Sequence, residues 1–300
     1  MTALPWRGPG PGRPDLPLPP RAMPLRRGGV WRKRWRYVGC FTDELLVCAA
    51  RVQVGPLGQT FFVVWDRGSR SMWERTRRLL PGARGEVWTE RVDGDGRLDN
   101  APEDGSIVRI EAQHPDEGEI RAFLRFGAGA WVEAASPTPE GGYVWTRKRA
   151  DVPVGCDVRV GERRWRAEAR GVEDESAGYH PHHTVWSWSA GVGRTRDGRS
   201  VGWNLVSGIN DAPERSERAV WIDGAPSEPG PVSFEDLDAV TFDDGSRLKF
   251  TAECERRREE QTLLVRYSYD QPLGSFAGTL PGGLELERGV GVMERHDARW

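Results

Sequence analysis

The sequence predicts an all-β fold in which two antiparallel β-barrels or sandwiches pack together, with a proline-rich N-terminal arm and few short helices. Apolar and polar residues alternate over much of the chain, which is the period of a half-buried strand. Turn signals separate these runs, and the runs are too many for one small sandwich. At 300 residues the chain is also long enough to bury a sizeable core.

The N-terminal arm is expected over residues 1–29, which are rich in Pro, Gly and Arg. The stretch 14-PDLPLPP-20 can form an extended polyproline segment, but proline lacks the N–H group that a strand ladder needs. Four apolar side chains could hold part of the arm against the body: Leu16, Leu18, Met23 and Leu25. A boundary near 151-DVPVG-155 then divides an N-terminal β domain, residues 30–155, from a C-terminal β domain, residues 156–300.

Strands are expected from Tyr37 onward. In 164-RWRAEAR-170 apolar residues alternate with charged ones, as in an antiparallel strand with one face buried. Similar alternation, or a β-branched and aromatic composition, marks four further runs: 120-IRAFLRF-126, 183-HTVWSWS-189, 248-LKFTAECE-255 and 263-LLVRYSY-269. Hairpin turns are expected at Asp197-Gly198, Asp223-Gly224, Asp244-Gly245 and 281-PGG-283.

Helical signal is scarce. The run 70-RSMWERTRRLL-80 places four residues on one helical stripe, and 234-FEDLDAV-240 could form one or two turns. The four residues of the stripe are Met72, Thr76, Leu79 and Leu80. We therefore expect at most short helices, with these two runs as the candidates.

The charge balance excludes two classes of partner. The chain has 43 Lys and Arg against 45 Asp and Glu, so it lacks the broad positive field that nucleic-acid or anionic-membrane binding needs. The basic run 32-RKRWR-36 is interpreted as a solvated strand edge. No window reaches the roughly 18 apolar residues of a membrane span, and no signal peptide is recognisable.

The cysteines indicate a reduced, cytoplasmic protein. Their spacing fits no zinc, redox or haem motif, so we expect small core hydrophobes rather than ligands. The four residues are Cys40, Cys48, Cys156 and Cys254.

Motifs of several enzyme and binding classes do not occur. The glycine-rich 189-SAGVGRTRDG-198 lies between two strand-like runs, whereas a phosphate-binding loop lies between a strand and a helix. No Gly-x-Ser-x-Gly elbow occurs, which excludes an α/β-hydrolase. The acidic stretch 93-DGDGRLDN-100 begins like a calcium loop, but Leu98 replaces the turn glycine and Asp104 the bidentate Glu. We interpret it as a solvated turn.

Three of the five histidines lie together in 179-YHPHHTVWSWSAGVG-193. His180 and His182 can face the same way on an extended backbone, a geometry that a metal could use. The nearest candidates for a third ligand precede a loop of unknown path: Glu173, Asp174 and Glu175. No metal is predicted, and His180, His182 and His183 are candidates either for loop histidines at a strand entry or for a general base.

Four indoles are candidates for a ligand cavity. Trp186 and Trp188 are two residues apart, so both project from one face of their strand, and Trp203 and Trp221 follow on later strands. Such indoles can equally fill an ordinary core. The glycines of 190-AGVG-193 favour the cavity, because they remove side-chain volume where something approaches closely.

Polar residues after the same hairpin could orient a ligand. They lie in 204-NLVSGINDAPERSER-218 and include Asn204, Asn210, Asp211, Glu214 and Glu217. In the C-terminal 291-GVMERHDARW-300, Glu294 and His296 share one face of an extended chain. A carboxylate that holds an imidazole is a usable acid/base dyad, while the alternative is a surface ion pair.

Several of these stretches together resemble the bacterial domain-of-unknown-function family 2804. They are residues 16–39, the central WSWSAGVG, 203-WNLVSGIND-211, 217-ERAVWIDG-224, 271-QPLGSFAGTLPGG-283 and 291-GVMERHDARW-300. The resemblance covers nearly the whole chain. Many relatives carry Asp-Trp-Gly shortly before the central aromatic strand, whereas this chain has 176-SAGYHPHHTVW-186 there. The resemblance therefore assigns no role to an aspartate at this place in the present chain.

The central aromatic, glycine-rich strand pair and the glycine-rich ending are similar in turn to tandem lipocalin-like proteins, which include carotenoid hydratases and pericyclases. This second resemblance implies two lipocalin-like β-barrels with a lipophilic pocket.

Three functions are compatible with the sequence. The first is a binder or cofactor-free hydratase, isomerase or cyclase for a lipophilic small molecule. Its ligand-binding candidates are Trp186, Trp188, Trp203, Asn204, Asn210 and Trp221, and its acid/base candidates are His180, His182, His183, Asp211, Glu217, Glu294 and His296. The alternatives are a carbohydrate-active protein that uses a pair such as Glu217 and Glu294, and a non-catalytic scaffold without a deep pocket.

Overall fold

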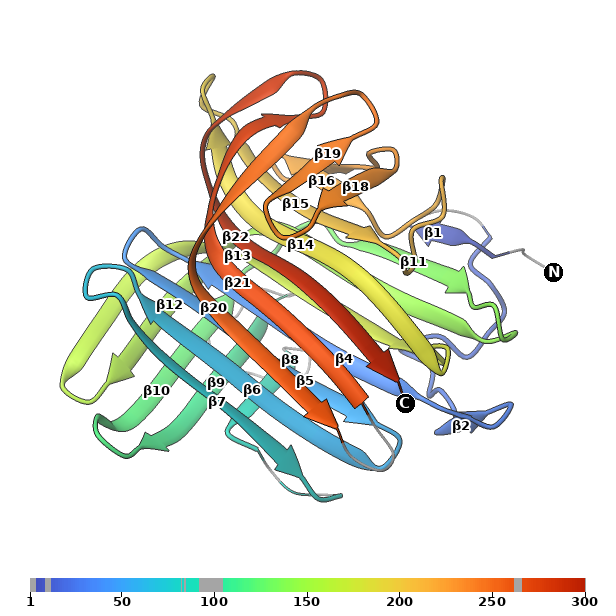
Figure 1. The fold of residues 1–300 in the computed structure, drawn as a ribbon, viewed down its shortest axis with the longest axis horizontal. Coiled ribbons are helices and arrows are strands. Elements are labelled where there is room, and N and C mark those ends of the chain that lie inside the picture. The colour runs from blue at the N-terminus through green and yellow to red at the C-terminus, as the bar shows by residue number, and fades with distance from the viewer. Residues whose placement is uncertain are drawn as a thin grey trace.

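The computed structural model describes residues 4–8, 12–81, 83, 85–91, 105–261 and 266–299, and every regular element among them is a β-strand. Two large curled antiparallel sheets make up the protein, and Figure 1 shows the second lying across the first. None of the described residues forms a helix that could cross a lipid bilayer. The all-β prediction is confirmed.

Within the part of the chain that the structure describes, the first sheet has 11 strands. They are β1 (Trp6–Gly8), β4 (Lys33–Phe41), β5 (Leu45–Val54), β6 (Leu57–Asp66), β7 (Ser71–Leu79), β8 (Val87–Arg91), β9 (Ser106–His114), β10 (Gly118–Phe126), β11 (Val132–Pro137), β12 (Tyr143–Val160) and β13 (Arg163–Gly178). Their order is β7-β6-β5-β4-β13-β12-β10-β9-β8, and β11 pairs with both β12 and β1. At the centre of the sheet β4 pairs with β13, although the two strands are far apart in the sequence.

The second sheet has nine strands among the described residues. They are β14 (His183–Thr195), β15 (Ser200–Ser207), β16 (Ala219–Ile222), β17 (Ala225–Ser227), β18 (Val232–Glu235), β19 (Ala239–Phe242), β20 (Arg247–Gln261), β21 (Arg266–Leu280) and β22 (Leu284–Arg299). Their order is β17-β16-β15-β14-β22-β21-β20-β19-β18. A separate hairpin pairs β2 (Arg26–Arg27) with β3 (Val30–Trp31).

The chain passes from the first sheet to the second between Gly178 and His183. The predicted boundary between residues 155 and 156 therefore lies inside β12, which pairs with β13 along most of its length. The division into domains stays a prediction. In the arm, Leu18 and Met23 are buried against Tyr143 and Tyr179, while Leu25 is exposed.

Both predicted helices are wrong. Residues 71–79 form β7, which pairs in register with the apolar β6 from Trp65–Met72 to Gly58–Leu79. Long-range pairing thus overrides a helical stripe that has only four members. Residues 234–240 contain the hairpin between β18 and β19, where Glu235 pairs with Ala239. The expected turn at 93–100, and residues 263–265, lie outside the described residues.

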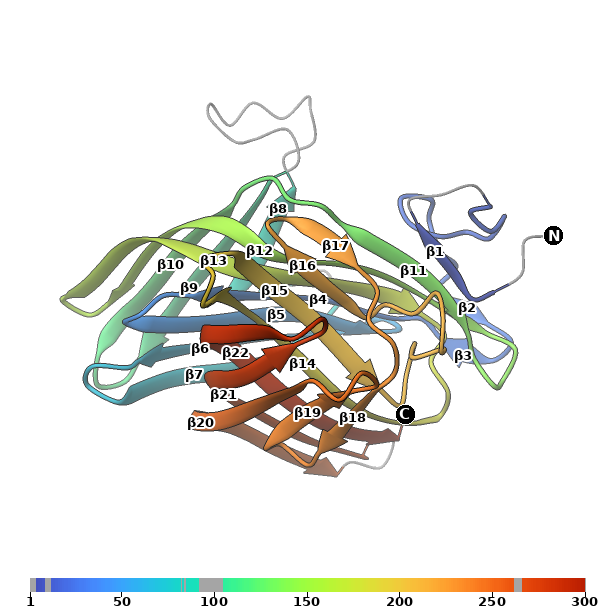
Figure 2. The same cartoon turned by 90° about the horizontal axis from the view of Figure 1, so that it is seen from above.

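Besides the cluster under the arm, the described residues form three hydrophobic cores on the faces of the two sheets. One fills the inside of the first sheet, for example Val64, Ile110 and Leu124, and a second fills the inside of the other sheet around Trp203 and Phe276. The third lies between the sheets, and Figure 2 shows the strands stacked in that region. Its residues come from both sheets and include Phe61, Trp188, Trp221, Leu273 and Val292.

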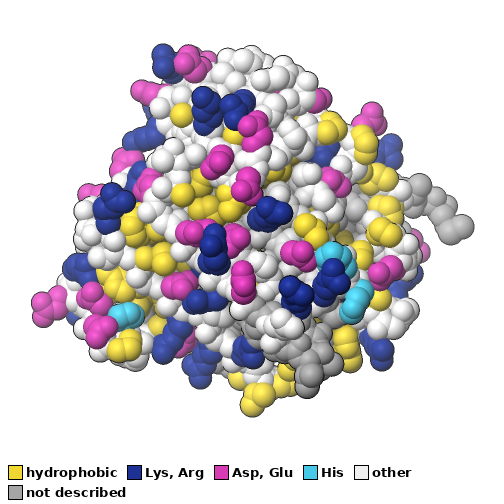
Figure 3. All heavy atoms as spheres, viewed as in Figure 1, with side chains coloured by type: hydrophobic (Ala, Val, Ile, Leu, Met, Phe, Trp, Pro, Cys, Tyr) yellow, Lys and Arg dark blue, Asp and Glu magenta, His cyan; other side chains and the backbone are white. Residues whose placement is uncertain are grey.

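The four cysteines are free thiols, and all except the half-buried Cys254 are buried. On the surface, charges of both signs are interspersed over the face drawn in Figure 3, without a large region of one sign. This arrangement agrees with the balanced composition of the chain.

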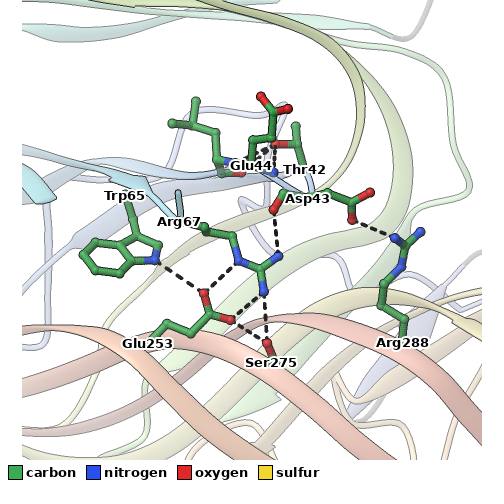
Figure 4. Close-up of polar contacts among 9 residues, drawn as sticks. Thr42, Asp43, Glu44, Trp65, Arg67, Glu253, Ser275 and Arg288 are labelled. Atoms are coloured by element: carbon green, nitrogen blue, oxygen red, sulfur yellow. Dashed lines mark hydrogen bonds and ion pairs between the residues drawn. The ribbon is translucent and has the colours of Figure 1, made fainter. Parts of the chain in front are cut away.

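A polar clamp joins the two sheets (Figure 4). The guanidinium of Arg67, just after β6, donates to both carboxylate oxygens of Glu253 on β20, at 2.8 and 2.7 Å. The hydroxyl of Ser275 donates to the same carboxylate at 2.5 Å. Arg288 of β22 also pairs with Asp43 at 2.7 Å, but both of those side chains are exposed. The Arg67–Glu253 pair is the better shielded connection.

Glu253→Gln should lower the free energy of unfolding by about 1 to 3 kcal/mol, because the new amide N–H₂ faces the donors of Arg67 or Ser275. Asp43→Asn, at the exposed pair, is the matched control and should change stability by less than about 0.5 kcal/mol. Urea unfolding followed by circular dichroism measures both values. Equal effects of the two substitutions would contradict the assignment of the clamp.

Candidate functional site

A cavity of about 350 Å³ lies between the two sheets. Its walls are mostly aromatic and aliphatic, with a few charged groups. The lining residues used below are Trp35, Tyr37, Phe61, Arg78, Lys148, Asp174, Trp186, Trp188, Asn210, Glu217, Arg256, Tyr267, Tyr269, Glu294 and His296. A space of this size can hold a small molecule of some 15 to 25 heavy atoms, as is typical of ligand pockets of roughly 300 to 1,000 Å³.

The first sheet contributes one wall through a row of directly opposed residues. Lys148 is opposite Asp174, Asp174 is opposite Tyr37, and the row continues through Ala50 and Phe61 on β5 and β6. Opposed residues in antiparallel strands point to the same side of the sheet. Since neighbouring strands are about 4.8 Å apart, the row from Lys148 to Phe61 is roughly 19 Å long. The wall is therefore elongated.

The second sheet contributes the opposite wall. Trp186 and Trp188 alternate along β14 and are opposite His296 and Glu294 of β22. His296 is in turn opposite Tyr269 of β21. Side chains two residues apart on a strand share a face, so the two indoles, the Glu294 carboxyl group and the His296 imidazole all lie on the face that meets the first sheet.

Ring contacts across the gap hold the two walls in place. Trp35 stacks on Trp186 with centroids 6.1 Å apart and ring planes 10° apart. Tyr37 meets Trp188 edge to face at 5.2 Å. Aromatic pairs of these geometries contribute about 0.5 to 1.5 kcal/mol beyond their burial, so these contacts stabilise the packing of the two walls.

The carboxyl group of Glu294 is buried at the cavity. Its Oε1 accepts a hydrogen bond from Trp186 Nε1 at 2.8 Å, and its Oε2 accepts one from Gln271 Nε2 at 2.9 Å. Burial raises the pKa of Glu294 to about 7, against the lowering effect of hydrogen bonds from Trp186 and Tyr269, and the charge of Asp174 raises it further. A group with this pKa can both donate and accept a proton near neutral pH.

A buried cluster of charges lies at one end of the cavity. Lys148 Nζ is 2.5 Å from Asp174 Oδ1 and 3.3 Å from Glu217 Oε1. Burial raises the pKa of both carboxyl groups and lowers that of Lys148, but the two carboxylates outweigh burial at Lys148 and its net pKa is raised. Asn210 Nδ2 donates to Glu217 at 3.0 Å. The ammonium group of Lys148 thus pairs with two carboxyl groups.

The other end of the cavity is cationic. Arg256 of β20 is buried with its guanidinium 4.0 Å from the ring centroid of Phe61 and 4.9 Å from that of Tyr269. Its Nη2 donates to Thr76 Oγ1 at 2.8 Å, and its Nε is 3.5 Å from Glu74. Arg258 shares Glu74 at 2.6 Å, so two guanidinium groups face one carboxylate here.

The histidines of the 180–183 cluster do not line the cavity. His180 is buried beside Trp35, its backbone carbonyl accepts from Lys33 Nζ at 2.9 Å, and burial lowers its pKa to about 3. His182 is exposed, and the exposed His183 lies 2.8 Å from Asp297. No group of three His, Cys, Asp or Glu side chains within the described ranges is arranged to hold a metal ion.

The other predicted residues divide between the cavity wall and the surrounding core. Those in the wall are Trp186, Trp188, Asn210, Glu217, Glu294 and His296. Asn204 lies behind the wall and accepts from Trp188 Nε1 at 2.8 Å. Trp203 is fully buried in the core of the second sheet, and Trp221 in the core between the sheets donates to Ala130 O at 2.8 Å. Asp211 accepts from Gly208 N at 2.7 Å in the adjacent loop.

The glycines of 190–193 accommodate the protein itself. A Cβ atom on Gly191 would lie 2.3 Å from the Trp203 ring, and one on Gly193 would lie 2.4 Å from Arg288 O. The close approach that these glycines permit is therefore within and between strands of the second sheet.

His296 lies against Trp186, with ring centroids 4.0 Å apart. Burial lowers the pKa of His296 to about 3, so its imidazole is neutral at pH 7.

Several lining residues were not predicted from the sequence. The main ones are Trp35, Tyr37, Phe61, Lys148, Asp174, Arg256 and Tyr269. The runs 147-RKR-149 and 173-EDE-175 contain a usable signal, because equal and opposite triplets on two strands can pair residue for residue. The remaining residues are brought to the cavity by strand pairings between distant parts of the chain.

Comparisons with known proteins give one family match and several fold matches. The model of a domain of unknown function, DUF2804, matches residues 20–300. No curated protein sequence matches the chain. Kievitone hydratase from Nectria haematococca is similar in structure, with a TM-score of 0.53 at 12% sequence identity over 88% of each chain. At this level of identity the likeness shows a shared fold and nothing further.

Two further solved structures are similar over most of their length. A Nitrosomonas europaea protein named AttH matches with a TM-score of 0.49 at 12% identity, over 93% of this chain and 97% of that chain. CghA matches with a TM-score of 0.42 at 8% identity, over 89% of this chain and 88% of that chain.

The raised pKa of Glu294 makes stability depend on pH. The folded state holds this proton up to about pH 7, whereas an unfolded Glu loses it near 4.5, so stability is lost as the pH rises between these values. Relative to Glu294→Gln, which does not titrate, the wild type should lose about 2 to 3 kcal/mol of stability between pH 5 and pH 8. Denaturant unfolding of both proteins at each pH measures the difference. A pH-independent difference would refute the assignment.

Proposed function

This chain belongs to the DUF2804 family, and we propose that it binds an elongated lipophilic small molecule between its two sheets and moves a proton on that molecule without a cofactor. The observation that carries the proposal is the buried carboxyl group of Glu294, with a pKa of about 7, in the wall of an aromatic cavity. An acid/base group and an apolar binding surface are the two parts that such a reaction needs.

Glu294 would be the catalytic acid. In its protonated form it donates its proton to a carbon–carbon double bond of the substrate, and the bond's electron pair forms the new C–H bond. The adjacent carbon becomes cationic and Glu294 becomes a carboxylate. The faces of Trp186, Trp188 and Tyr269 are attractive to positive charge and would stabilise that intermediate.

Three outcomes of the cationic intermediate keep atoms in balance. Loss of a different proton to the Glu294 carboxylate gives an isomer, and attack by a second double bond followed by the same proton loss gives a ring. Attack by water, with the water proton returned to Glu294, gives a hydrate. The shared fold with kievitone hydratase supports hydration among these three.

The remaining lining groups would position the substrate. Asn210 and Glu217 present polar atoms at the Lys148 end of the cavity, where they suit a hydroxyl group or the attacking water. His296 contacts the Trp186 ring from the neighbouring strand, and its lowered pKa of about 3 leaves the imidazole neutral at pH 7, so it is not an acid in this scheme. The presence of this cavity argues against a scaffold without a deep pocket.

Binding is tested by tryptophan fluorescence with a panel of lipids, terpenoids and sugars. A lipophilic compound that binds should quench the indoles of the cavity, and Trp186→Phe should remove part of that quenching. Trp203→Phe is the matched control, because Trp203 is buried in the core of the second sheet. The binding proposal fails if no lipophilic compound quenches the emission, or if both variants respond alike to every compound that does.

Proton transfer is tested on compounds that bind. In deuterated water the wild type should place deuterium in the product, detected by mass spectrometry. Glu294→Gln should slow this incorporation by at least about 100-fold, the usual contribution of a general acid, while binding stays within about threefold of wild type. Unchanged incorporation in the variant would assign the chemistry to another group.

A further inference from the structure

The two ends of the cavity differ in charge, and this difference indicates how an occupant lies. At the end formed by β12 and β13, Lys148 is shared by Asp174 and Glu217, so carboxyl groups outnumber the cation. At the end formed by β6, β7 and β20, Arg256 and Arg258 share Glu74. An elongated molecule with one anionic end is therefore favoured in only one orientation.

Arg256 has more N–H donors at the cavity than it has hydrogen-bond partners among the described residues. A guanidinium carries five N–H donors, and within the described residues Arg256 makes one hydrogen bond, to Thr76, and one ion pair, at 3.5 Å to Glu74. Its side chain is only 2% exposed, so water does not cover the remaining donors freely. A buried cation with unused donors is stabilised when an anionic oxygen reaches it.

The rings of Phe61 and Tyr269 fix the position of this guanidinium. They lie 4.0 and 4.9 Å from its central carbon, so the side chain is held by stacking before any occupant arrives. Lys148, the other buried cation of the wall, is already committed to two carboxyl groups. Arg78 lies on an exposed part of β7 at the rim. Arg256 is thus the cation best placed to bind an anion inside the cavity.

We propose that the ligand of this cavity is a lipophilic monocarboxylate whose carboxylate binds Arg256 while its apolar body lies along the aromatic wall past Glu294. The inference rests on the proposed function and specifies its substrate class. Arg256 would act as the specificity-determining residue, because burying a carboxylate without a cationic partner is strongly unfavourable.

The strand order also places the reacting carbon. Arg256 is opposite Gln271 on β21, and Gln271 donates to Glu294 on the next strand, β22. Two strand spacings separate Arg256 from Glu294, or about 10 Å. The double bond that meets Glu294 is therefore several carbons away from the carboxylate, in the middle of the molecule rather than conjugated to its acid group.

The test compares cis-parinaric acid with its methyl ester, which has the same polyene but no charge. Binding of each is followed by energy transfer from tryptophan to the polyene. The wild type should bind the acid at least about tenfold more tightly than the ester, as expected for a hydrogen-bonded charge. In Arg256→Met the preference should fall to within about twofold, while ester affinity stays unchanged, which shows that the variant is folded.

Arg257→Met is the matched control. Arg257 does not line the cavity. It is exposed on the other face of β20, where it pairs with Asp270 at 2.7 Å. This variant should therefore keep the wild-type preference for the acid. Equal binding of acid and ester by the wild type, or a preference that survives in Arg256→Met, would overturn the inference and leave the proposed function standing. If neither probe binds and no other lipophilic compound does, the proposed function fails and this inference fails with it.

Discussion

The carboxyl group of Glu294 is buried between two sheets whose facing surfaces are otherwise largely apolar, and the candidate site depends on this burial. A carboxylate at this position loses most of its hydration, and three neutral hydrogen-bond donors, Trp186, Tyr269 and Gln271, replace only part of it. The proton is therefore retained up to about neutral pH. The stability that the folded protein loses as the pH rises from about 4.5 to about 7 is the cost of keeping an acid/base group in an apolar cavity.

The second requirement is a gap between sheets that pack closely elsewhere. Phe61, Trp188 and Leu273 belong to one continuous core between the sheets, and the clamp of Arg67 and Glu253 fixes an edge of the same interface. Stacked and edge-to-face rings then line the gap instead of filling it. Aromatic walls and buried charges at both ends would, under the proposal, give an occupant one preferred direction.

The sequence predicted the fold class because the alternation of apolar and polar residues reports directly on strands with one buried face. It did not predict β7, since a short helical stripe looks the same whether or not an apolar strand such as β6 is available to pair with it. On β14, alternation identified Trp186 and Trp188 as a pair on one face. It could not separate them from Trp203, because both faces of that sheet are buried. Arg256 and Tyr37 reach the cavity through pairings that only the folded chain defines.

The most direct measurement is the titration of the Glu294 carboxyl group itself, by carbon NMR of protein labelled at the glutamate side chains, with Glu294→Gln to assign the signal. We predict a midpoint near pH 7 in the absence of ligand, well above the value of about 4.3 for a solvated glutamate. A midpoint between pH 4 and 5 would mean that the group is ionised and solvated at neutral pH, and Glu294 would then not be the acid proposed above.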